Sequence, residues 1–334
     1  MARLSGAAAV LGALGVAAAF LLWWIPADDF LFVPDEAKPL ADKVEVEGGR
    51  AGTGGGIYYV DLFVRRIRTL EQLLPFTRPE GSTRVSEEVL APNDETDAER
   101  RRQNTEDMER SEEVAAVVAL RSLGYDVTAT PKGVLVTSIV PDVPAAEVLQ
   151  VNDVVLAVDG VDTLTPARLR AEIGSREPGS ELRLTVRRGG RRVDATVRTV
   201  RSPQDPSRAV VGILVEQDAE IELPIDVDID LGRVGGPSAG LPFALEIVRQ
   251  LGRDVTGSCR IAATGGLALD GTVIPIGGVK QKTIGARRAD VDFFLVPAEQ
   301  NAEEARRYAE GLRVVPVESF QQALRRLATT PKNC

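Results

Sequence analysis

The stretch Gly235-Gly236-Pro237-Ser238-Ala239-Gly240 decides how the C-terminal part of the chain folds. It follows residues 225–229, where apolar and acidic residues alternate as in a half-exposed strand. After it, apolar residues recur at helical spacing: Leu241, Ala244, Leu245, Val248 and Leu251. Ser238 is therefore expected at the N-terminus of a helix, where free backbone N–H groups and the helix dipole favour a developing negative charge.

The same stretch also fits the G-x-S-x-G pattern of the nucleophile elbow in α/β-hydrolases. That elbow requires a histidine base, and the chain has 0 histidines in 334 residues, so this interpretation is rejected. The remaining alternative is that Ser238 is an ordinary helix N-cap.

A second glycine-framed element offers a base for Ser238. Gly277-Gly278 follows a short predicted strand and precedes a predicted helix over residues 279–288. One face of that helix reads Val279, Lys282, Ala286 and Ala289. A lysine buried among such residues can act as a base because desolvation lowers its pKa. Lys280 shares its face with Arg287 and is expected to be solvated.

These two elements resemble the proteolytic domain of the Lon family, whose serine lies in a "GPSAG" helix start and whose lysine follows "PIGG". The resemblance extends through Ala263-Thr264-Gly265 and through residues 294–297. It implies that Ser238 is the nucleophile and Lys282 the base, with Thr264 near the lysine. Gly236 and Ala239, on either side of the Pro237-Ser238 pair, are supporting candidates. The implied fold class is α+β.

Residues 126–202 resemble a PDZ domain. They contain short strands and turns, with Gly133-Val134-Leu135-Val136 similar to the loop and strand that hold a peptide's C-terminus. Such an edge binds an extended peptide as an added strand. The alternative is a closed β domain that binds no peptide.

Two segments before residue 125 suggest that the PDZ segment is inserted into the proteolytic domain. Gly55–Gly56 with a predicted strand at 57–64, and residues 107–111 in a predicted helix at 106–123, resemble the opening pieces of a Lon proteolytic domain. Asp61 would then lie near the active site. The expected segments are 1–30 (anchor), 31–125 (linker, strand and helix), 126–202 (PDZ) and 203–334 (proteolytic).

The N-terminus contains an uncharged run of 19 residues, 7–25, that ends in Trp23, Trp24 and Ile25. This length suits a transmembrane helix with tryptophans at the interface. A cleaved signal peptide is the alternative, because Ala17-Ala18-Ala19 could serve as a cleavage site. Arg3 before the run and two aspartates after it predict a cytoplasmic N-terminus and an extracytoplasmic protease at the cell membrane.

Composition excludes several other functions. The net charge of −9 argues against nucleic-acid binding, and no G-x-x-x-x-G-K-S/T pattern for ATP is present. Two cysteines, Cys259 and Cys334, allow one disulfide at most, and neither lies in a metal-binding pattern. We therefore expect no metal and no cofactor, and the sequence leaves open whether the cysteines pair.

The sequence thus predicts a membrane-anchored, ATP-independent serine endopeptidase with a Ser238–Lys282 dyad, which cleaves unfolded or flexible proteins captured by its PDZ domain. The resemblance to Lon also implies a homo-oligomer, a hexameric ring. Two alternatives stay open: a catalytically inert peptide-binding scaffold and a signal-peptidase-like processing protease.

Overall fold

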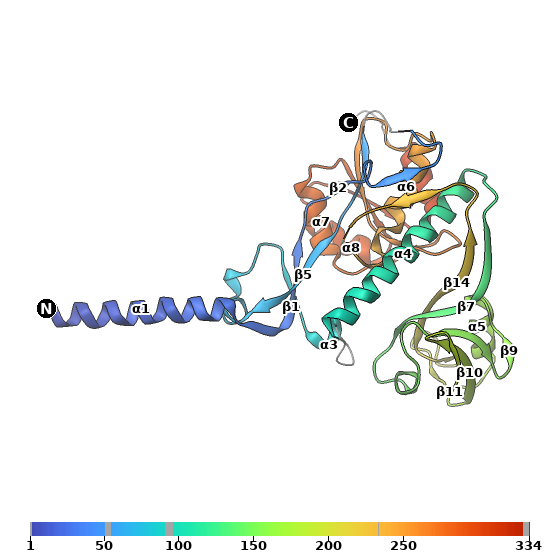
Figure 1. Cartoon of the computed structure of the whole chain (residues 1–334), viewed down its shortest axis with the longest axis horizontal. Coiled ribbons are helices and arrows are strands. Elements are labelled where there is room, and N and C mark those ends of the chain that lie inside the picture. Colours follow the sequence, from blue (N-terminus) through green and yellow to red (C-terminus); the bar gives the residue numbers. More distant parts are fainter. Residues whose placement is uncertain (1, 51–54, 91–95, 233, 330–333) are drawn as a thin grey trace. The chain divides into compact units, whose positions relative to one another are not determined.

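The computed structural model describes residues 2–50, 55–90, 96–232, 234–329 and 334, although the side chains of residues 2–11 and 18 lie outside that description. The chain divides into two compact units. Unit 1 combines Met1–Leu123 with Ile225–Cys334, and unit 2 is Gly124–Pro224. Unit 1 is thus built from two separate stretches of sequence, blue to teal and yellow to red in Figure 1, whereas unit 2 is one continuous stretch.

The main sheet of unit 1 has five strands in the order β2-β4-β16-β19-β20. β2 runs antiparallel at one edge, and the other four are parallel, with Ile57 opposite Ile261. The strands are β2 (Lys38–Pro39), β4 (Gly56–Tyr59), β16 (Arg260–Ala263), β19 (Phe293–Pro297) and β20 (Arg313–Val317). A strand from before unit 2 therefore pairs with one from after it, which is the pairing that an inserted PDZ segment requires.

Helices pack on this sheet through apolar faces. Val279 and Ala286 of one helix and Ala302 and Ala305 of another share a buried cluster with Phe294 of β19. The larger helices of unit 1 are α4 (Asp97–Ser122), α6 (Gly240–Gln250), α7 (Val279–Arg288), α8 (Gln300–Tyr308) and α9 (Phe320–Thr329). The expected mixed fold of helices and strands is confirmed, and the main sheet is largely parallel.

The strand predicted over residues 57–64 is in fact two strands. The chain leaves β4 after Tyr59 and enters β5 (Leu62–Arg68), which belongs to a second sheet of order β5-β1-β6. The single-strand prediction was wrong because the apolar run continues across the break, so periodicity gave no sign of it.

The remaining elements of unit 1 are α1 (Ala2–Trp24), β1 (Pro26–Pro34), β3 (Val44–Val46), α2 (Thr69–Leu73), the 3-10 helix Pro75–Thr77, β6 (Thr83–Val85), α3 (Glu87–Leu90), β15 (Val227–Ile229), the 3-10 helix Pro237–Ala239, β17 (Gly266–Leu267) and β18 (Val273–Ile274).

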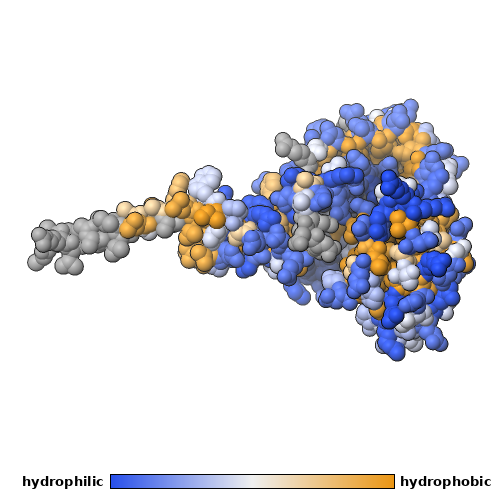
Figure 2. Space-filling model, turned by 60° about the horizontal axis from the view of Figure 1, so that its bottom comes forward, coloured by the Kyte–Doolittle hydropathy of each residue, from blue (hydrophilic) through white to orange (hydrophobic). Residues whose placement is uncertain are grey.

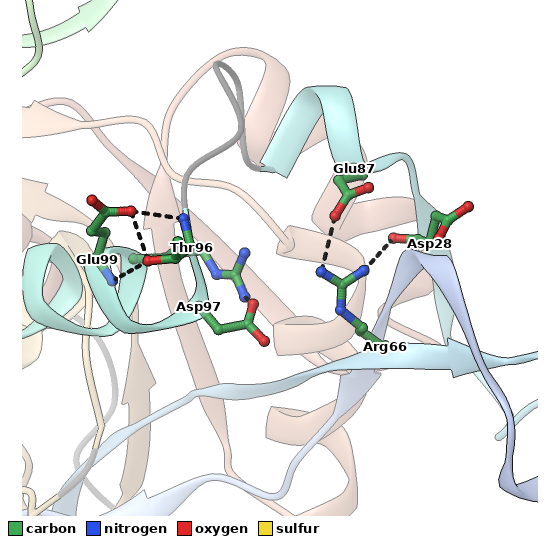
Figure 3. Close-up of polar contacts among 7 residues, drawn as sticks. Asp28, Arg66, Glu87, Thr96, Asp97 and Glu99 are labelled. Carbon is green, nitrogen blue, oxygen red and sulfur yellow. Dashed lines mark hydrogen bonds and ion pairs between the residues drawn. The ribbon is translucent and has the colours of Figure 1, made fainter.

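Helix α4 begins earlier than its apolar residues indicated. Thr96 caps it: the Glu99 amide donates to Thr96 Oγ1 at 3.2 Å, and the Thr96 amide donates to Glu99 Oε2 at 2.8 Å (Figure 3). This reciprocal pair satisfies backbone groups that a helix start would otherwise leave open. The first turns of α4 are polar, so the hydrophobic pattern detected only the part from residue 106 onward.

Unit 2 is a small β-rich domain whose sheet has the order β11-β10-β8-β7-β14, with β9 beside β8. It extends to Pro224, past the expected boundary at residue 202, because β14 pairs with β7 over its whole length. Thr165 caps its helix through Oγ1, which accepts from the Arg168 amide at 3.3 Å. The elements are β7 (Thr128–Ile139), the 3-10 helix Pro144–Glu147, β8 (Val154–Val158), β9 (Val161–Asp162), α5 (Pro166–Gly174), β10 (Glu181–Arg188), β11 (Arg191–Arg198), β12 (Val200–Arg201), β13 (Ala209–Val210) and β14 (Ile213–Glu222).

A transmembrane span was predicted at residues 7–25, and all of it except Ile25 lies in α1. Among the residues that can be described, no helix combines the length and the apolar character needed to cross a membrane. The predicted span includes residues 7–11 and 18, whose side chains lie outside the described part.

Candidate active site

Ser238 lies in the one-turn 3-10 helix that leads into α6. Gly236 enters this turn at φ +97°, a backbone conformation that glycine adopts without strain. The Ser238 carbonyl accepts from the Gly265 amide at 2.9 Å and from Thr264 Oγ1 at 3.2 Å. The turn is thereby fixed to the segment that follows β16.

Lys282 projects from α7 toward this serine. Its Nζ lies 2.5 Å from Ser238 Oγ, and the lysine is only 4% exposed. Burial lowers the pKa of Lys282 to about 8, against a smaller opposing effect from the charge of Asp61. The structure therefore places an amine with a depressed pKa in hydrogen-bonding contact with the serine hydroxyl.

Gly278 starts α7 in a left-handed conformation at φ +70°, and a Cβ here would overlap Leu62 Cδ2. The Lys282 amide donates to the Gly278 carbonyl at 3.0 Å in the first turn of the helix. The glycine thus allows the tight entry that places Lys282 one turn into the helix.

Thr264 directly follows β16 and is fully buried. Lys282 Nζ donates to Thr264 Oγ1 at 3.3 Å. Thr264 therefore bridges the lysine and the serine turn, and it lies near the lysine, as the resemblance to Lon implied.

Lys280, the other lysine of this helix, lies elsewhere. Its Nζ donates to the Ser82 carbonyl and to Thr83 Oγ1, both at 3.3 Å, and lies 5.4 Å from the centre of the Tyr308 ring. Only Lys282 of the two contacts Ser238 among the described residues.

Asp61 follows the end of β4 and forms an ion pair with Lys38 at 3.3 Å. Lys38 also pairs with Asp35 at 2.6 Å. Burial raises the pKa of Asp61, and the Lys38 cation opposes that rise. Asp61 thus lies close enough to influence Lys282 electrostatically, and Lys38 balances its charge.

Gly236 and Ala239 were predicted as supporting residues beside the serine. The Gly236 amide donates to the Asn104 carbonyl of α4 at 2.8 Å, so this N–H is already engaged within the protein. Ala239 is buried at the start of α6.

Two asparagines that were not predicted from the sequence hold these elements in place. The Asn104 carbonyl fixes the serine turn, and a Cβ on Gly235 would come within 2.8 Å of Asn104 Cβ. Asn301 of α8 accepts from the Ile276 amide at 2.8 Å and donates to the Ile276 carbonyl at 3.1 Å, just before Gly277. Neither asparagine lies in a motif, and only the folded chain brings them to these positions.

The predicted peptide-binding strand of unit 2 does not lie at an edge. Val134 and Leu135 pair with β8 on one side and with β14 on the other, and Gly133–Val136 are all buried. The assignment of Gly133, Val134, Leu135 and Val136 to peptide binding was wrong because a strand with two partners has no free backbone groups for a third.

β14 ends the sheet instead. Within the described part of unit 2, no strand pairs with its outer edge, and α5 contacts it. Gly212, just before β14, has φ +79°, and its carbonyl accepts a hydrogen bond from the Val140 amide at 2.9 Å. Leu214 on this strand is 62% exposed. β14 is therefore the strand that could accept an extended chain.

The described residues contain one group with metal-ligand geometry, formed by Cys259, Asp292 and Cys334. The two sulfurs are joined in a disulfide, so they have no thiolate to offer a metal ion. The pairing that the sequence left open is thus present, and it ties the chain end to the residue preceding β16.

Comparisons with known proteins match two parts of this chain. Residues 209–329 match the family model for the Lon protease C-terminal proteolytic domain, and residues 121–199 match that for the PDZ domain. The first match includes Ser238, Thr264 and Lys282.

Similar curated proteins include Lon protease 1 of Sorangium cellulosum (37% identical over 111 residues; 30% of this chain and 13% of that protein). Lon protease of Buchnera aphidicola subsp. Schizaphis graminum is 39% identical over 100 residues, covering 29% of this chain and 13% of that protein. The rat mitochondrial Lon protease homolog is 36% identical over 122 residues, or 34% and 13%. The chain thus spans 13% of the length of each of these three relatives.

A solved PDZ domain of an SdrC-like protein from Listeria monocytogenes is also similar. It has 25% sequence identity and a TM-score of 0.25, and the match covers 26% of this chain and 92% of that domain.

Proposed function

We propose that this chain, which carries a Lon-type proteolytic domain and a PDZ domain, is a serine endopeptidase with Ser238 as nucleophile and Lys282 as general base. One observation carries the proposal: a buried lysine with its Nζ 2.5 Å from the hydroxyl of a serine at a helix start. A buried amine next to a hydroxyl is the arrangement that activates a serine without histidine.

In the proposed reaction, neutral Lys282 takes the proton of Ser238 as Oγ attacks the peptide carbonyl carbon. The lysine ammonium then gives that proton to the leaving amine, and the acyl-enzyme is hydrolysed by water. Thr264 Oγ1, 3.3 Å from Nζ, orients the amine in both steps. Since the Gly236 amide is bonded to Asn104, the oxyanion falls to backbone amides after Pro237, with Ala239 as the candidate.

Asp61 adjusts the base in this proposal. Its negative charge favours protonated Lys282, whereas burial favours the neutral form. The Lys38 cation beside Asp61 limits that charge. The balance leaves the pKa of Lys282 at about 8, within the range that suits a lysine acting as a general base.

Substrate capture is proposed at β14. An extended C-terminal tail would add to the open edge of this strand, beside α5, by β-augmentation. This places the peptide on a different strand from the one that the sequence indicated. Because the sequence has no ATP-binding P-loop pattern, the proposed substrates are proteins that are already unfolded or flexible.

Membrane anchoring is proposed from the sequence alone. The uncharged run at residues 7–25 and its tryptophans support an anchor with the protease outside the cytoplasm. The hexameric ring implied by the resemblance to Lon stays a prediction.

The test uses the full chain and an unfolded casein substrate without ATP. We expect cleavage by wild type, loss of cleavage with Ser238→Ala and with Lys282→Ala, and retained cleavage with Lys280→Ala as matched control. Equal activity of wild type and Ser238→Ala would leave an inert peptide-binding scaffold as the better description.

A further inference from the structure

An apolar surface lies where α1 joins the rest of unit 1. Leu73, Leu74 and Phe76, at the end of α2 and in the 3-10 helix after it, are 61%, 39% and 82% exposed. We call these three residues the apolar foot. Trp24 and Ile25, at the end of α1, are exposed as well. Figure 2 shows hydrophobic surface gathered at this junction.

The helix that carries the foot, α2, buries the charged side chain of Glu71 and exposes the apolar side chain of Leu73. Glu71 is 1% exposed, and its carboxylate accepts hydrogen bonds from the two terminal nitrogens of the Arg65 guanidinium, at 2.6 and 2.8 Å. This pair holds the pKa of Glu71 below its ordinary value. A helix that faces water normally shows the opposite arrangement, with apolar residues inward. The exposed side chains of Leu73 and Leu74 therefore suit an apolar surrounding.

The foot is fixed to the end of α1. The Thr69 amide and Thr69 Oγ1 both donate to the Ile25 carbonyl, at 2.9 and 3.0 Å. The Arg68 guanidinium lies 4.1 Å from the centre of the Trp23 ring. These contacts keep α2 beside the tryptophans that close the uncharged run.

The neighbouring segments are also joined. Arg66 donates to the Asp28 carbonyl at 3.1 Å and to Glu87 of α3 at 2.9 Å (Figure 3). Asp28 lies three positions after Ile25, so β1, β5 and α3 are tied together just beyond the end of α1. The exposed side chains of the apolar foot are thus carried by segments that hydrogen bonds hold together.

We propose that the apolar foot inserts into the interfacial layer of a lipid bilayer, beside the membrane end of α1. The inference rests on the proposed membrane anchor. Lipid is the occupant because the foot adjoins Trp23, Trp24 and Ile25, where a span ending at residue 25 would reach the interface. Leucine and phenylalanine at that depth lie among acyl chains, while Arg66 and Arg68 remain at the headgroups.

The foot would give the protease a second contact with the membrane. A single helix allows the attached domain to tilt and rotate, whereas two adjacent contacts fix its orientation. The foot therefore sets how unit 1 faces the bilayer.

The experiment measures lipid contact at single positions of the full chain. Phe76→Cys and, as matched control, Gln300→Cys at an exposed site on α8 are labelled with an environment-sensitive fluorophore without reductant. The native cysteines stay protected in their disulfide. The labelled proteins are reconstituted into phosphatidylcholine–phosphatidylglycerol vesicles that contain lipids with a spin-label quencher near the headgroup. Vesicle flotation reports the anchor separately.

We expect flotation of both proteins and several-fold stronger quenching at position 76 than at position 300. Adding Leu73→Asp to the labelled Phe76→Cys protein should reduce the quenching without changing flotation. Flotation with equal quenching at the two positions would overturn the foot and leave the anchor standing. Absence of flotation would overturn the anchor and the foot together. Blue-shifted emission at position 76 without lipid quenching would indicate a protein contact, such as a second copy, and would overturn the lipid assignment.

Discussion

Units 1 and 2 differ in how well a sequence motif predicted the position of the candidate site. The site compared is the Ser238 site in unit 1 and the peptide-binding strand in unit 2. In unit 1 the motif residues Ser238, Thr264 and Lys282 meet at the lysine amine. Lys282 Nζ lies 2.5 Å from Ser238 Oγ and 3.3 Å from Thr264 Oγ1. In unit 2 the motif residues Gly133–Val136 lie buried in a central strand, and the open edge belongs to β14.

The difference follows from what each site requires. A serine at a helix start and a lysine one turn into another helix are positioned largely by local glycines, which the sequence displays. An edge strand is defined by the absence of a partner, and partners are set by pairing between distant segments. β14 begins more than 70 residues after Val136, and no local pattern reports that it takes the outer position.

The largest expected effect lies in the Ser238 site. Ser238→Ala and Lys282→Ala should each lower kcat/KM for casein by at least about 10³-fold, because one removes the nucleophile and the other its base. Lys280→Ala should stay close to wild type, since its amine contacts Ser82 and Thr83. Loss of activity with Lys280→Ala instead of Lys282→Ala would contradict the claim that the motif in unit 1 identified the correct lysine.

The next largest effect tests whether local glycines position the lysine. Gly278→Ala should lower activity about 10²-fold through misplacement of α7, because the position has φ +70° and a Cβ would overlap Leu62. It should also lower the free energy of unfolding by about 1–3 kcal/mol. Gly277→Ala is the control, since a Cβ there meets nothing within 4 Å. Equal kinetics for the two variants would contradict this account.

The third prediction sharpens the comparison in unit 2. Leu214→Asp, on the open edge, should weaken binding of a peptide with a free apolar C-terminus by about tenfold, with little change in Tm. Val136→Ala, in the central strand, should lower the free energy of unfolding by about 2 kcal/mol and leave peptide affinity unchanged. Binding by fluorescence anisotropy and thermal unfolding distinguish the two. Loss of affinity with Val136→Ala alone would return the peptide to the strand that the sequence indicated.

The sequence was sufficient for the type of each unit and for the three residues that meet around Lys282, and it was insufficient for the boundaries of the units and for the hydrogen bonds that fix the site. It located Ser238, Lys282 and Thr264 because they lie beside glycines or strand ends. It extended one strand across the break between Tyr59 and Leu62, and it gave no sign that the Asn104 carbonyl engages the Gly236 amide. Asn104 and Asn301 act through single hydrogen bonds from distant helices, so periodicity and motifs could not indicate them.

A smaller effect concerns the cost of burying Lys282. Replacing this cation by an apolar side chain of similar length, Lys282→Met, should abolish activity and raise Tm by a few degrees at pH 7, because at that pH wild type buries a charge. The folded pKa lies near 8 and the unfolded value near 10.5, so unfolding takes up a proton between these values. Wild-type stability therefore rises with pH across this window, and the advantage of Lys282→Met should shrink from pH 8 to 10. A constant difference in Tm would show that Lys282 does not titrate in this range.

The central claim is that Lys282 is a buried base that activates Ser238, and the rate of Ser238 labelling by a fluorophosphonate, measured from pH 6 to 10.5, tests it most directly. With a pKa of about 8, Lys282 should give a labelling rate that rises with pH and is half-maximal near pH 8, and Lys282→Ala should remove that rise. Labelling that is half-maximal only above pH 10, or that is the same in Lys282→Ala as in wild type, would contradict the account.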